Sequence, residues 1–297
     1  MNSKEKYIIN WGELHATIFE NLIRDFNNEG FKYFILRNYE ELPQKNSSKD
    51  VDIIIEPAGY TLASSLLKNI LIKNNIANFK VVKYERVRCF FGIDVANNFS
   101  IHIDLIEGYL SKGFEVFDFE ELYNQTEVYK DFKVLNSSYD AIMLLYYKVI
   151  GSRQLKEQYK RKISAIYKKE SKVIDETIKR TLNKSSSDLI ISALEKNDFY
   201  DIVKNADKMS RSSKNRVFVK KPLKTICNII KFLFEKFYRI IICPRKFQNF
   251  ISVQGADGTG KSTFIEGLIK AIAFYNVSEI SKSHVYHHRP KILPNLG

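Results

Sequence analysis

Apolar residues recur first at helical spacing and then in short strand-like runs, and together they predict an α/β fold. Between Trp11 and Asn28 the apolar period is three to four residues, so this stretch is expected to be a helix closed by Gly30. A second helix is expected over 60–73. Alternation and short apolar runs predict strands over 31–36, 51–55, 79–84, 89–95 and 100–106. The turn Ala96-Asn97-Asn98 is expected to join the last two strands as a hairpin. The first half of the chain is therefore expected to place helices on a small mixed sheet.

From Asn136 onward the pattern becomes helical. Ser137 or Ser138 is expected to cap a helix that runs through about Val149 and ends at Gly151. The middle of the chain is thus predicted to be a helical region without strands.

Two segments precede the last part of the chain. The stretch 205–221 is polar and rich in serine, which predicts a linker. After Pro222, apolar residues recur at helical spacing to about residue 243, interrupted by lysines and arginines that exclude a membrane span. This amphipathic helix is expected either to pack against a neighbouring domain or to lie on an anionic membrane surface.

The composition is that of a globular chain, and its charge is uneven. Of 297 residues 44% are hydrophobic, enough for about two cores, and the net charge is +13. The first 140 residues carry 16 Lys and Arg against 21 Asp and Glu, so the basic character belongs to the rest. Residues 151–184 alone carry 11 basic against 4 acidic side chains, either as a solvated face or as one wall of a catalytic cleft. Such a basic half is compatible with anionic lipid or with phosphorylated small molecules, and nucleic acid is not the expected partner, because no stacking or groove-binding motif accompanies the charge.

Cysteine usage and the N-terminus bear on the compartment. Cys89, Cys227 and Cys243 form no C-x-x-C pair, which is typical of a reducing cytosol. The first residues contain no apolar signal segment, and no run of 18 uncharged apolar residues occurs. A cytoplasmic protein without a transmembrane segment is the resulting prediction.

The stretch Phe250–Ile272 contains a phosphate-binding loop motif. Its G-x-x-x-x-G-K-[ST] pattern follows an apolar run and precedes a helical pattern, which is the context such a loop requires. Backbone amides of the loop are expected to surround phosphate oxygens, Lys261 to reach the β- and γ-phosphates as a catalytic group, and the Ser262 hydroxyl to ligate Mg²⁺. The alternative is a glycine-rich turn before a capped helix. The predicted nucleotide contacts are Gly255, Asp257, Gly258, Thr259, Gly260, Lys261, Ser262 and Thr263.

A second candidate site consists of carboxylates in the first half of the chain. Asp50 and Asp52 stand two residues apart at the start of a predicted strand, so both are expected on one face of the sheet. Asp104 lies on a later strand that can pair alongside. Three converging carboxylates repel one another unless cations separate them, and two Mg²⁺ ions about 4 Å apart are the usual reason for such a cluster. The alternative is that Asp50 caps a turn while Asp52 and Asp104 point to water from a half-exposed sheet.

Residues 31–106 resemble the nucleotidyltransferase superfamily with the DNA polymerase β-like fold. The resemblance rests on a strand, the Asp50–Asp52 pair and a third acid, Asp104, on a later strand. It implies that these three residues are catalytic metal ligands for Mg²⁺ or Mn²⁺ with an NTP as substrate. Where the family has Gly-Ser after the first strand, this chain has Arg37-Asn38, and Arg37 is expected to contact phosphate in its place.

The order of motifs along most of the chain resembles the two-part thymidylate kinase-like proteins of bacterial capsule and lipopolysaccharide loci. That resemblance implies a nucleotidyltransferase-like domain over 1–135, a helical domain over 136–204, a linker and amphipathic helix over 205–247, and the start of a P-loop kinase-like domain over 248–297. It also implies ATP- and Mg²⁺-dependent phosphoryl or nucleotidyl transfer linked to surface polysaccharide synthesis.

Only 36 residues follow Lys261, and beyond Glu279 no acidic residue occurs. Arg289 is the candidate phosphate contact on the substrate side. The kinase half is therefore expected to be incomplete and inactive, with uncovered apolar surface that promotes association into oligomers. The competing hypothesis is a regulatory or scaffold module that binds nucleotide at both sites without turnover.

Overall fold

The computed structural model describes residues 11–46, 48, 50–82, 86–94, 97, 99–241, 253 and 258–267. The chain divides into two compact units, one of residues 10–247 and one made of residues 1–9 with 248–297. The first unit holds the sheet and nearly all described helices. The second is described only around the P-loop motif.

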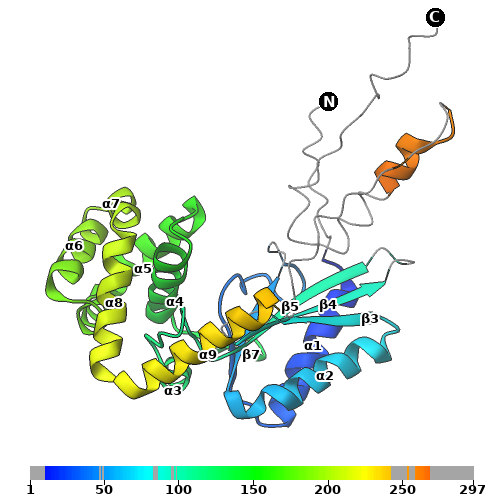
Figure 1. Cartoon of the computed structure of the whole chain (residues 1–297), viewed down its shortest axis with the longest axis horizontal. Coiled ribbons are helices and arrows are strands. Elements are labelled where there is room, and N and C mark those ends of the chain that lie inside the picture. The colour runs from blue at the N-terminus through cyan, green and yellow to red at the C-terminus, as the bar shows by residue number, and fades with distance from the viewer. Residues whose placement is uncertain are drawn as a thin grey trace, which may run out of the picture. The chain divides into compact units, whose positions relative to one another are not determined.

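A seven-stranded mixed sheet organises the first unit (Figure 1). Its spatial order is β3-β4-β5-β2-β1-β7-β6, in which β2 is parallel to β5, β1 is parallel to β7, and the other neighbours are antiparallel. The strands are β1 (Tyr33–Ile35), β2 (Val51–Ile55), β3 (Ala77–Val82), β4 (Val87–Asp94), β5 (Phe99–Glu107), β6 (Thr126–Tyr129) and β7 (Phe132–Leu135). The predicted α/β class, five strands and hairpin between β4 and β5 are confirmed. The sequence did not predict β6 and β7, because each has only four residues.

One face of the sheet packs against α1 (Glu13–Asn28) and α2 (Tyr60–Lys73), as the periodicity predicted. Apolar residues at every second strand position meet the buried stripe of α1; among them are Ile53, Ile103 and Leu105. The close approach of α2 depends on Gly92 in β4, since a Cβ there would lie 2.7 Å from Leu71 Cδ2. A short 3₁₀ turn, η1 (Pro57–Gly59), leads from β2 into α2.

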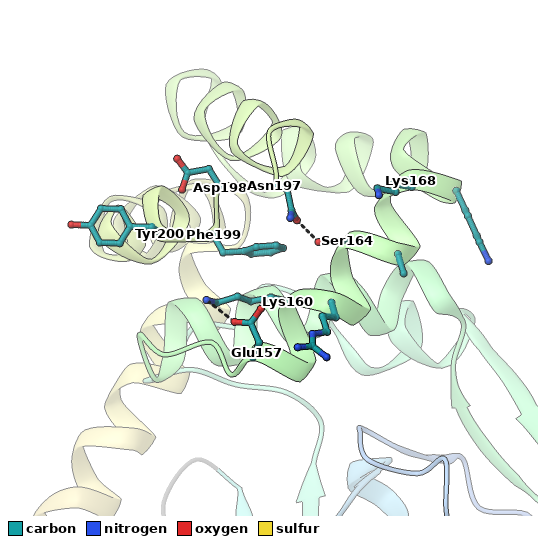
Figure 2. Close-up of a pocket in the computed structure, with 11 residues that line it drawn as sticks. Glu157, Lys160, Ser164, Lys168, Asn197, Asp198, Phe199 and Tyr200 are labelled. Carbon is teal, nitrogen blue, oxygen red and sulfur yellow. Dashed lines mark hydrogen bonds and ion pairs between the residues drawn. The ribbon is translucent and has the colours of Figure 1, made fainter.

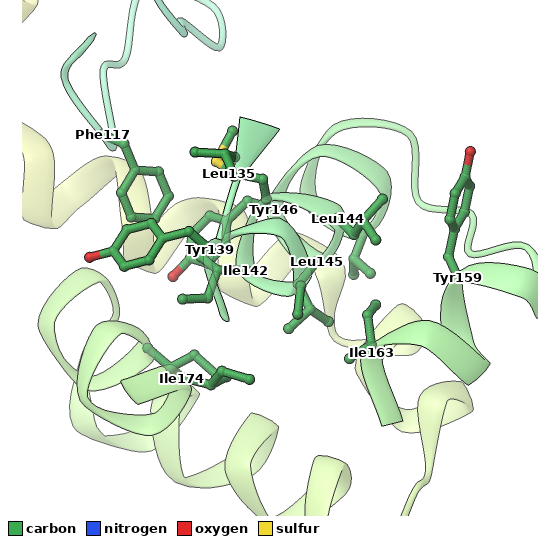
Figure 3. Packing of buried hydrophobic residues seen from close by; sticks show 14 of the residues in the cluster. Phe117, Leu135, Tyr139, Ile142, Leu144, Leu145, Tyr146, Tyr159, Ile163 and Ile174 are labelled. Atoms are coloured by element: carbon green, nitrogen blue, oxygen red, sulfur yellow. The ribbon is translucent and has the colours of Figure 1, made fainter. Parts of the chain in front are cut away.

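The opposite face of the sheet shares one core with the helical region. Phe34, Ile54 and Ile106 belong to the same buried cluster as residues of α4, α5, α6 and α7. Figure 3 shows the part of this cluster in which Ile142 of α4 packs near Ile163 and Ile174 of α5. The helices after β5 are α3 (Phe119–Tyr123), α4 (Ser137–Leu144), α5 (Glu157–Thr181), α6 (Lys184–Glu195), α7 (Phe199–Lys204), α8 (Ala206–Lys220) and α9 (Pro222–Ile241). The helical region therefore stabilises the sheet directly, and a boundary at residue 135 stays a prediction.

The helix predicted to begin at Ser137 or Ser138 is capped by another residue. Asn136 is the N-cap, and its side-chain oxygen accepts a hydrogen bond of 3.0 Å from the Tyr139 amide. Both serines instead donate to Glu170, at a kink inside α5. The capping prediction was wrong because asparagine one position earlier reaches the same amide. The helix then continues as a π-helical segment, η2 (Leu145–Gly151).

The predicted linker at 205–221 is helix α8. Its polar composition is misleading because Ser212 and Ser213 are buried, and the Ser212 hydroxyl accepts a hydrogen bond of 2.7 Å from the Asn183 amide. Small hydroxyl side chains thus serve close helix packing here rather than chain flexibility.

The amphipathic helix predicted after Pro222 is confirmed as α9. Much of its apolar stripe stays exposed within the described residues, including Phe234 and Phe237. Among the helices that the structure describes, none combines the length and the apolar character needed to cross a bilayer.

Candidate active site

Strands β2 and β5 bring the three predicted carboxylates together. The parallel register places Asp52 opposite Asp104, and strand alternation puts Asp50 on the same face as Asp52. One carboxylate oxygen from each of the three lies within 4.8 Å of the others. The expected pairing of the two strands is therefore present, and the alternative in which Asp52 and Asp104 point to water is wrong, because both are buried.

The three acids differ in burial. Asp52 and Asp104 are buried, whereas the Asp50 side chain is 29% exposed and borders the solvent. Burial raises the pKa of Asp52 above its ordinary value, and the nearby Arg37 guanidinium opposes this shift. A buried carboxylate beside two others is stabilised in its charged form by an additional cation.

Arg37 follows β1 and lies against the acidic cluster. Its Nε donates to Asp52 Oδ2 at 2.5 Å, its Nη2 lies 4.0 Å from Asp50 Oδ2, and its guanidinium stacks 4.6 Å from the centre of the Tyr147 ring. Burial is the largest single influence and acts to lower the pKa of Arg37, but the charge of Asp52, the hydrogen bond to it, and the charges of Tyr147 and Asp50 together outweigh burial, so the net shift is upward. The residue is therefore a fixed positive charge inside the site. Its predicted phosphate contact stays a prediction, because in this structure the guanidinium binds carboxylates.

Segment η2 contributes a basic and an aromatic side chain that the sequence pattern alone did not assign to the site. Lys148 Nζ lies 4.8 Å from the Tyr147 ring centre and 5.7 Å from that of Tyr159. Burial and the neighbouring Arg37 lower the pKa of Lys148 to about 8. A lysine at an otherwise apolar helical position was the available signal in the sequence.

Next to Asp104 lie two further buried side chains with ligand atoms. His102 Nε2 lies 2.8 Å from Asp104 Oδ1, and Cys89 is the direct cross-strand neighbour of Asp104 on β4. Neither residue was predicted to belong to a site. The two-residue spacing between His102 and Asp104, which puts them on one strand face, was the signal that identifies the histidine.

The basic stretch 151–184 forms most of α5 and borders a pocket that is separate from the acidic cluster. This pocket has a volume of about 690 Å³ and is lined from α5 and from the turn between α6 and α7 (Figure 2). Lys160, Lys168 and Tyr200 are among its lining residues, and none of the three carboxylates is. Lys162 on the same helix instead reaches inward, with Nζ 2.5 Å from both Asp140 Oδ2 and Glu40 Oε1. The basic helix thus has both a solvated face and an inward lysine.

The P-loop motif is described from Gly258 to Gly267. Gly258 and Gly260 have positive φ values of 85° and 78°, which only glycine adopts without strain, and residues 261–267 are helical. The Phe264 amide donates to the Gly260 carbonyl at 2.9 Å, which starts the helix at Lys261. Lys261 is partly buried, while Thr259, Ser262 and Thr263 are exposed. Gly255, Asp257 and Arg289 lie outside the described residues, and the nucleotide contacts stay a prediction.

Comparisons with known proteins add little beyond the geometry. No protein-family model and no curated protein matches the chain. Two solved structures from Helicobacter pylori are similar at 10% identity. One, JHP933, has a TM-score of 0.39 and is covered over 96% of its length by 77% of this chain. The other, provisionally named a nucleotidyltransferase, has a TM-score of 0.29 and is covered over 95% by 68% of this chain. At these scores the likeness carries no conclusion about this chain, whose function has to be inferred from its own residues.

Proposed function

We propose that the chain is a Mg²⁺- or Mn²⁺-dependent nucleotidyltransferase that acts on an NTP and a small sugar-type or phosphorylated acceptor. The observation that carries this proposal is the convergence of Asp50, Asp52 and Asp104, whose ligand atoms lie within 4.8 Å of one another. Three ionised carboxylates at this spacing repel one another, and in proteins bound divalent cations commonly neutralise such repulsion.

The donor set fits the proposed metal. All three ligands are carboxylate oxygens, which are the ligands that Mg²⁺ prefers; Asp52 and Asp104 lie on strands, and Asp50, just before β2, leaves the site open to solvent. When bound, the metal supplies charge neutralisation and orientation of phosphate oxygens.

The chain's own cations complete the proposed site. Arg37 would exchange its Asp52 contact for a phosphate oxygen, since the same guanidinium geometry fits both anions. Lys148 adds a second positive charge on the side formed by η2. Arg37 and Lys148 together would bind the triphosphate, which is part of the role that the Gly-Ser pair has in the nucleotidyltransferase superfamily that this chain resembles.

The P-loop motif supports a second proposed phosphate site in the other unit, around Lys261. The resemblance to two-part thymidylate kinase-like proteins is the basis for proposing a role in surface polysaccharide synthesis.

The rival proposal is a module that binds nucleotide without turnover. Its support is the direct Arg37–Asp52 pair, which competes with a cation for the same carboxylate.

Metal binding tests the acidic site directly. Asp52→Asn is expected to weaken Mn²⁺ affinity by at least about 10- to 100-fold, because it removes a charged ligand. Asp131→Asn, an exposed aspartate at the β6–β7 turn, is the control and should bind Mn²⁺ as the parent does. Equal affinities in the parent and Asp52→Asn, measured by calorimetry, would leave no basis for the metal site.

Label transfer separates the two proposals. With an NTP labelled at the α-phosphate, nucleotidyl transfer moves the label to an acceptor, whereas a label at the γ-phosphate reports phosphoryl transfer. Transfer of α-label that Asp52→Asn abolishes supports the enzyme. Saturable NTP binding with no transfer of either label, across a panel of sugar phosphates, supports the binding module.

A further inference from the structure

We infer that Cys89, His102 and Asp104 form a second metal site, for a thiophilic divalent cation such as Zn²⁺, beside the three-carboxylate site. The three residues come from neighbouring antiparallel strands, β4 and β5, and Cys89 faces Asp104 directly in the register. One ligand atom from each lies within 4.8 Å of the other two, and all three side chains are buried.

The donor atoms determine which ion fits. A thiolate, an imidazole nitrogen and a carboxylate oxygen are the three ligand types that Zn²⁺ uses, with bonds of about 2.0–2.3 Å. Ligand atoms around such an ion lie roughly 3.3–3.8 Å apart. In this structure His102 Nε2 and Asp104 Oδ1 are 2.8 Å apart and the remaining separations are at most 4.8 Å, so binding needs shifts of no more than about 1 Å. The cluster of Asp50, Asp52 and Asp104 offers oxygen alone and suits a hard cation instead. The two sites therefore differ in chemistry although they share Asp104.

Charge balance favours a divalent ion at this buried place. Binding forms one metal–sulfur bond while the Cys89 thiol releases its proton to solvent, and neutral His102 coordinates through Nε2 with its proton on Nδ1. A thiolate and a carboxylate then offset the two charges of the ion, so the loaded site is neutral. A neutral cluster avoids the cost of an uncompensated charge in the interior.

A purely packing role predicts a different behaviour. In that alternative Cys89 is a small core residue, and His102 only binds Asp104 and stacks on Phe91, with the ring centres 4.3 Å apart and an angle of 20° between the ring planes. Such a cluster would have no affinity for thiophilic metals. The distinction is therefore directly measurable.

The shared ligand couples the two sites. An ion held by Cys89 and His102 would draw Asp104 away from the three-carboxylate site, so Zn²⁺ is expected to weaken Mn²⁺ binding there. This coupling rests on the proposed metal-dependent function, whereas the thiophilic site itself does not.

Cobalt absorption tests the thiophilic site in the full chain after treatment with a chelator. Co²⁺ should give a sulfur-to-cobalt charge-transfer band in the near ultraviolet that saturates at one ion per chain and that Zn²⁺ removes. Cys89→Ala should lose the band, and His102→Gln should weaken Co²⁺ affinity about 10-fold or more, with folding checked by circular dichroism. Cys227→Ser, at an exposed cysteine on α9, and Cys243→Ser are the matched controls and should keep the band.

Two outcomes would overturn the inference: no charge-transfer band in the parent chain, or a band that persists in Cys89→Ala. Asp50→Asn separates this result from the proposed function, since Asp50 belongs only to the carboxylate site. That variant should bind Mn²⁺ poorly and still give the cobalt–thiolate band. Loss of the band in Asp50→Asn would show that the two clusters are one site and would also contradict the inference.

Discussion

Lys148 is the residue whose ionisation is set most clearly by its surroundings. Its pKa is lowered to about 8, first by burial and then by the positive charge of Arg37. The ammonium is therefore protonated below pH 8 and becomes neutral as the pH rises through that value. In the proposed site this change would remove one positive charge from the contact with the triphosphate.

NTP affinity of the acidic site is accordingly expected to fall roughly 10-fold as the pH rises from 7 to 9, since a hydrogen bond to a charged group contributes about 1.5–3 kcal/mol. Lys148→Arg should flatten this profile, because guanidinium stays protonated throughout. The measurement is calorimetric binding in a Lys261→Ala background, which removes the P-loop contribution. An unchanged pH profile in Lys148→Arg would exclude a phosphate contact for this lysine.

At this scale the sequence identified the carboxylates but not their neighbours. Asp50, Asp52 and Asp104 were predictable because strand alternation puts two on one face and a plausible pairing adds the third. Cys89 and Lys148 were not assigned, since their positions depend on strand register and on the path of η2, whereas His102 was overlooked although it lies two residues from Asp104 on the same strand. Register is a tertiary property that a local pattern does not encode.

Helices α4 and α5 share an ion pair between Asp140, which is buried, and Lys162, whose side chain is 28% exposed. Asp140 is 1% exposed, and its Oδ2 lies 2.5 Å from Lys162 Nζ and 3.3 Å from the Tyr39 hydroxyl. Burial raises the pKa of Asp140, and Lys162 opposes the shift. The pair therefore compensates a carboxylate that would otherwise be costly in the core.

Lys162→Met should lower the free energy of unfolding by about 3 kcal/mol, because it leaves Asp140 buried without its ammonium partner. Denaturation with urea, followed by circular dichroism, measures the change. Lys160→Met is the matched control on the same helix; its partner Glu157 is 65% exposed, so a change within about 0.5 kcal/mol is expected. Adding Asp140→Asn to Lys162→Met should restore part of the loss, and no recovery would mean that packing, not charge, dominates.

Element prediction succeeded where periodicity is strong and failed where packing decides. The apolar stripes of α1 and α9 were predicted correctly because each follows a helical period over many residues, and α2 was predicted as a helix. The serine-rich stretch of α8 was misread, since its hydroxyls are buried against neighbouring helices rather than solvated. Composition alone does not distinguish these two uses of serine.

For the whole molecule, the division into two units makes the two candidate sites separable. The carboxylate cluster belongs to the unit of residues 10–247, and the P-loop motif belongs to the other. A P-loop binds phosphate through its own backbone amides and lysine, without groups from the sheet of the first unit.

Lys261→Ala is therefore expected to remove the ATP binding that the P-loop contributes and to leave Mn²⁺ binding at the carboxylate site unchanged. Asp52→Asn should weaken Mn²⁺ binding and the ATP binding of the carboxylate site while leaving the ATP binding of the P-loop, and the double variant should show the sum of both effects, as independent sites do. Parallel calorimetric titrations with Mn²⁺ and with ATP provide the comparison. A Lys261→Ala chain with weakened Mn²⁺ affinity would show that the sites are coupled.

The predicted domain scheme illustrates how little a local pattern says about domain boundaries. The change from strands to helices near residue 136 is real, yet Phe34 and Ile54 share their core with the helices beyond it. A change in local pattern does not reveal whether the two sides bury surface against each other. That information lies in contacts between residues far apart in the chain.

The register between β2 and β5 also bears on how the sheet assembles. The two strands are parallel neighbours, but α2, β3 and β4 separate them along the chain. A slip of one residue would turn Asp104 toward α1 and α2 and bring an isoleucine beside Asp52, because strand side chains alternate. A cation that needs both carboxylates therefore binds only chains with the native alignment. The fraction of Mn²⁺ binding recovered during refolding would therefore measure the fraction of chains with a correctly assembled sheet, even before any substrate is known.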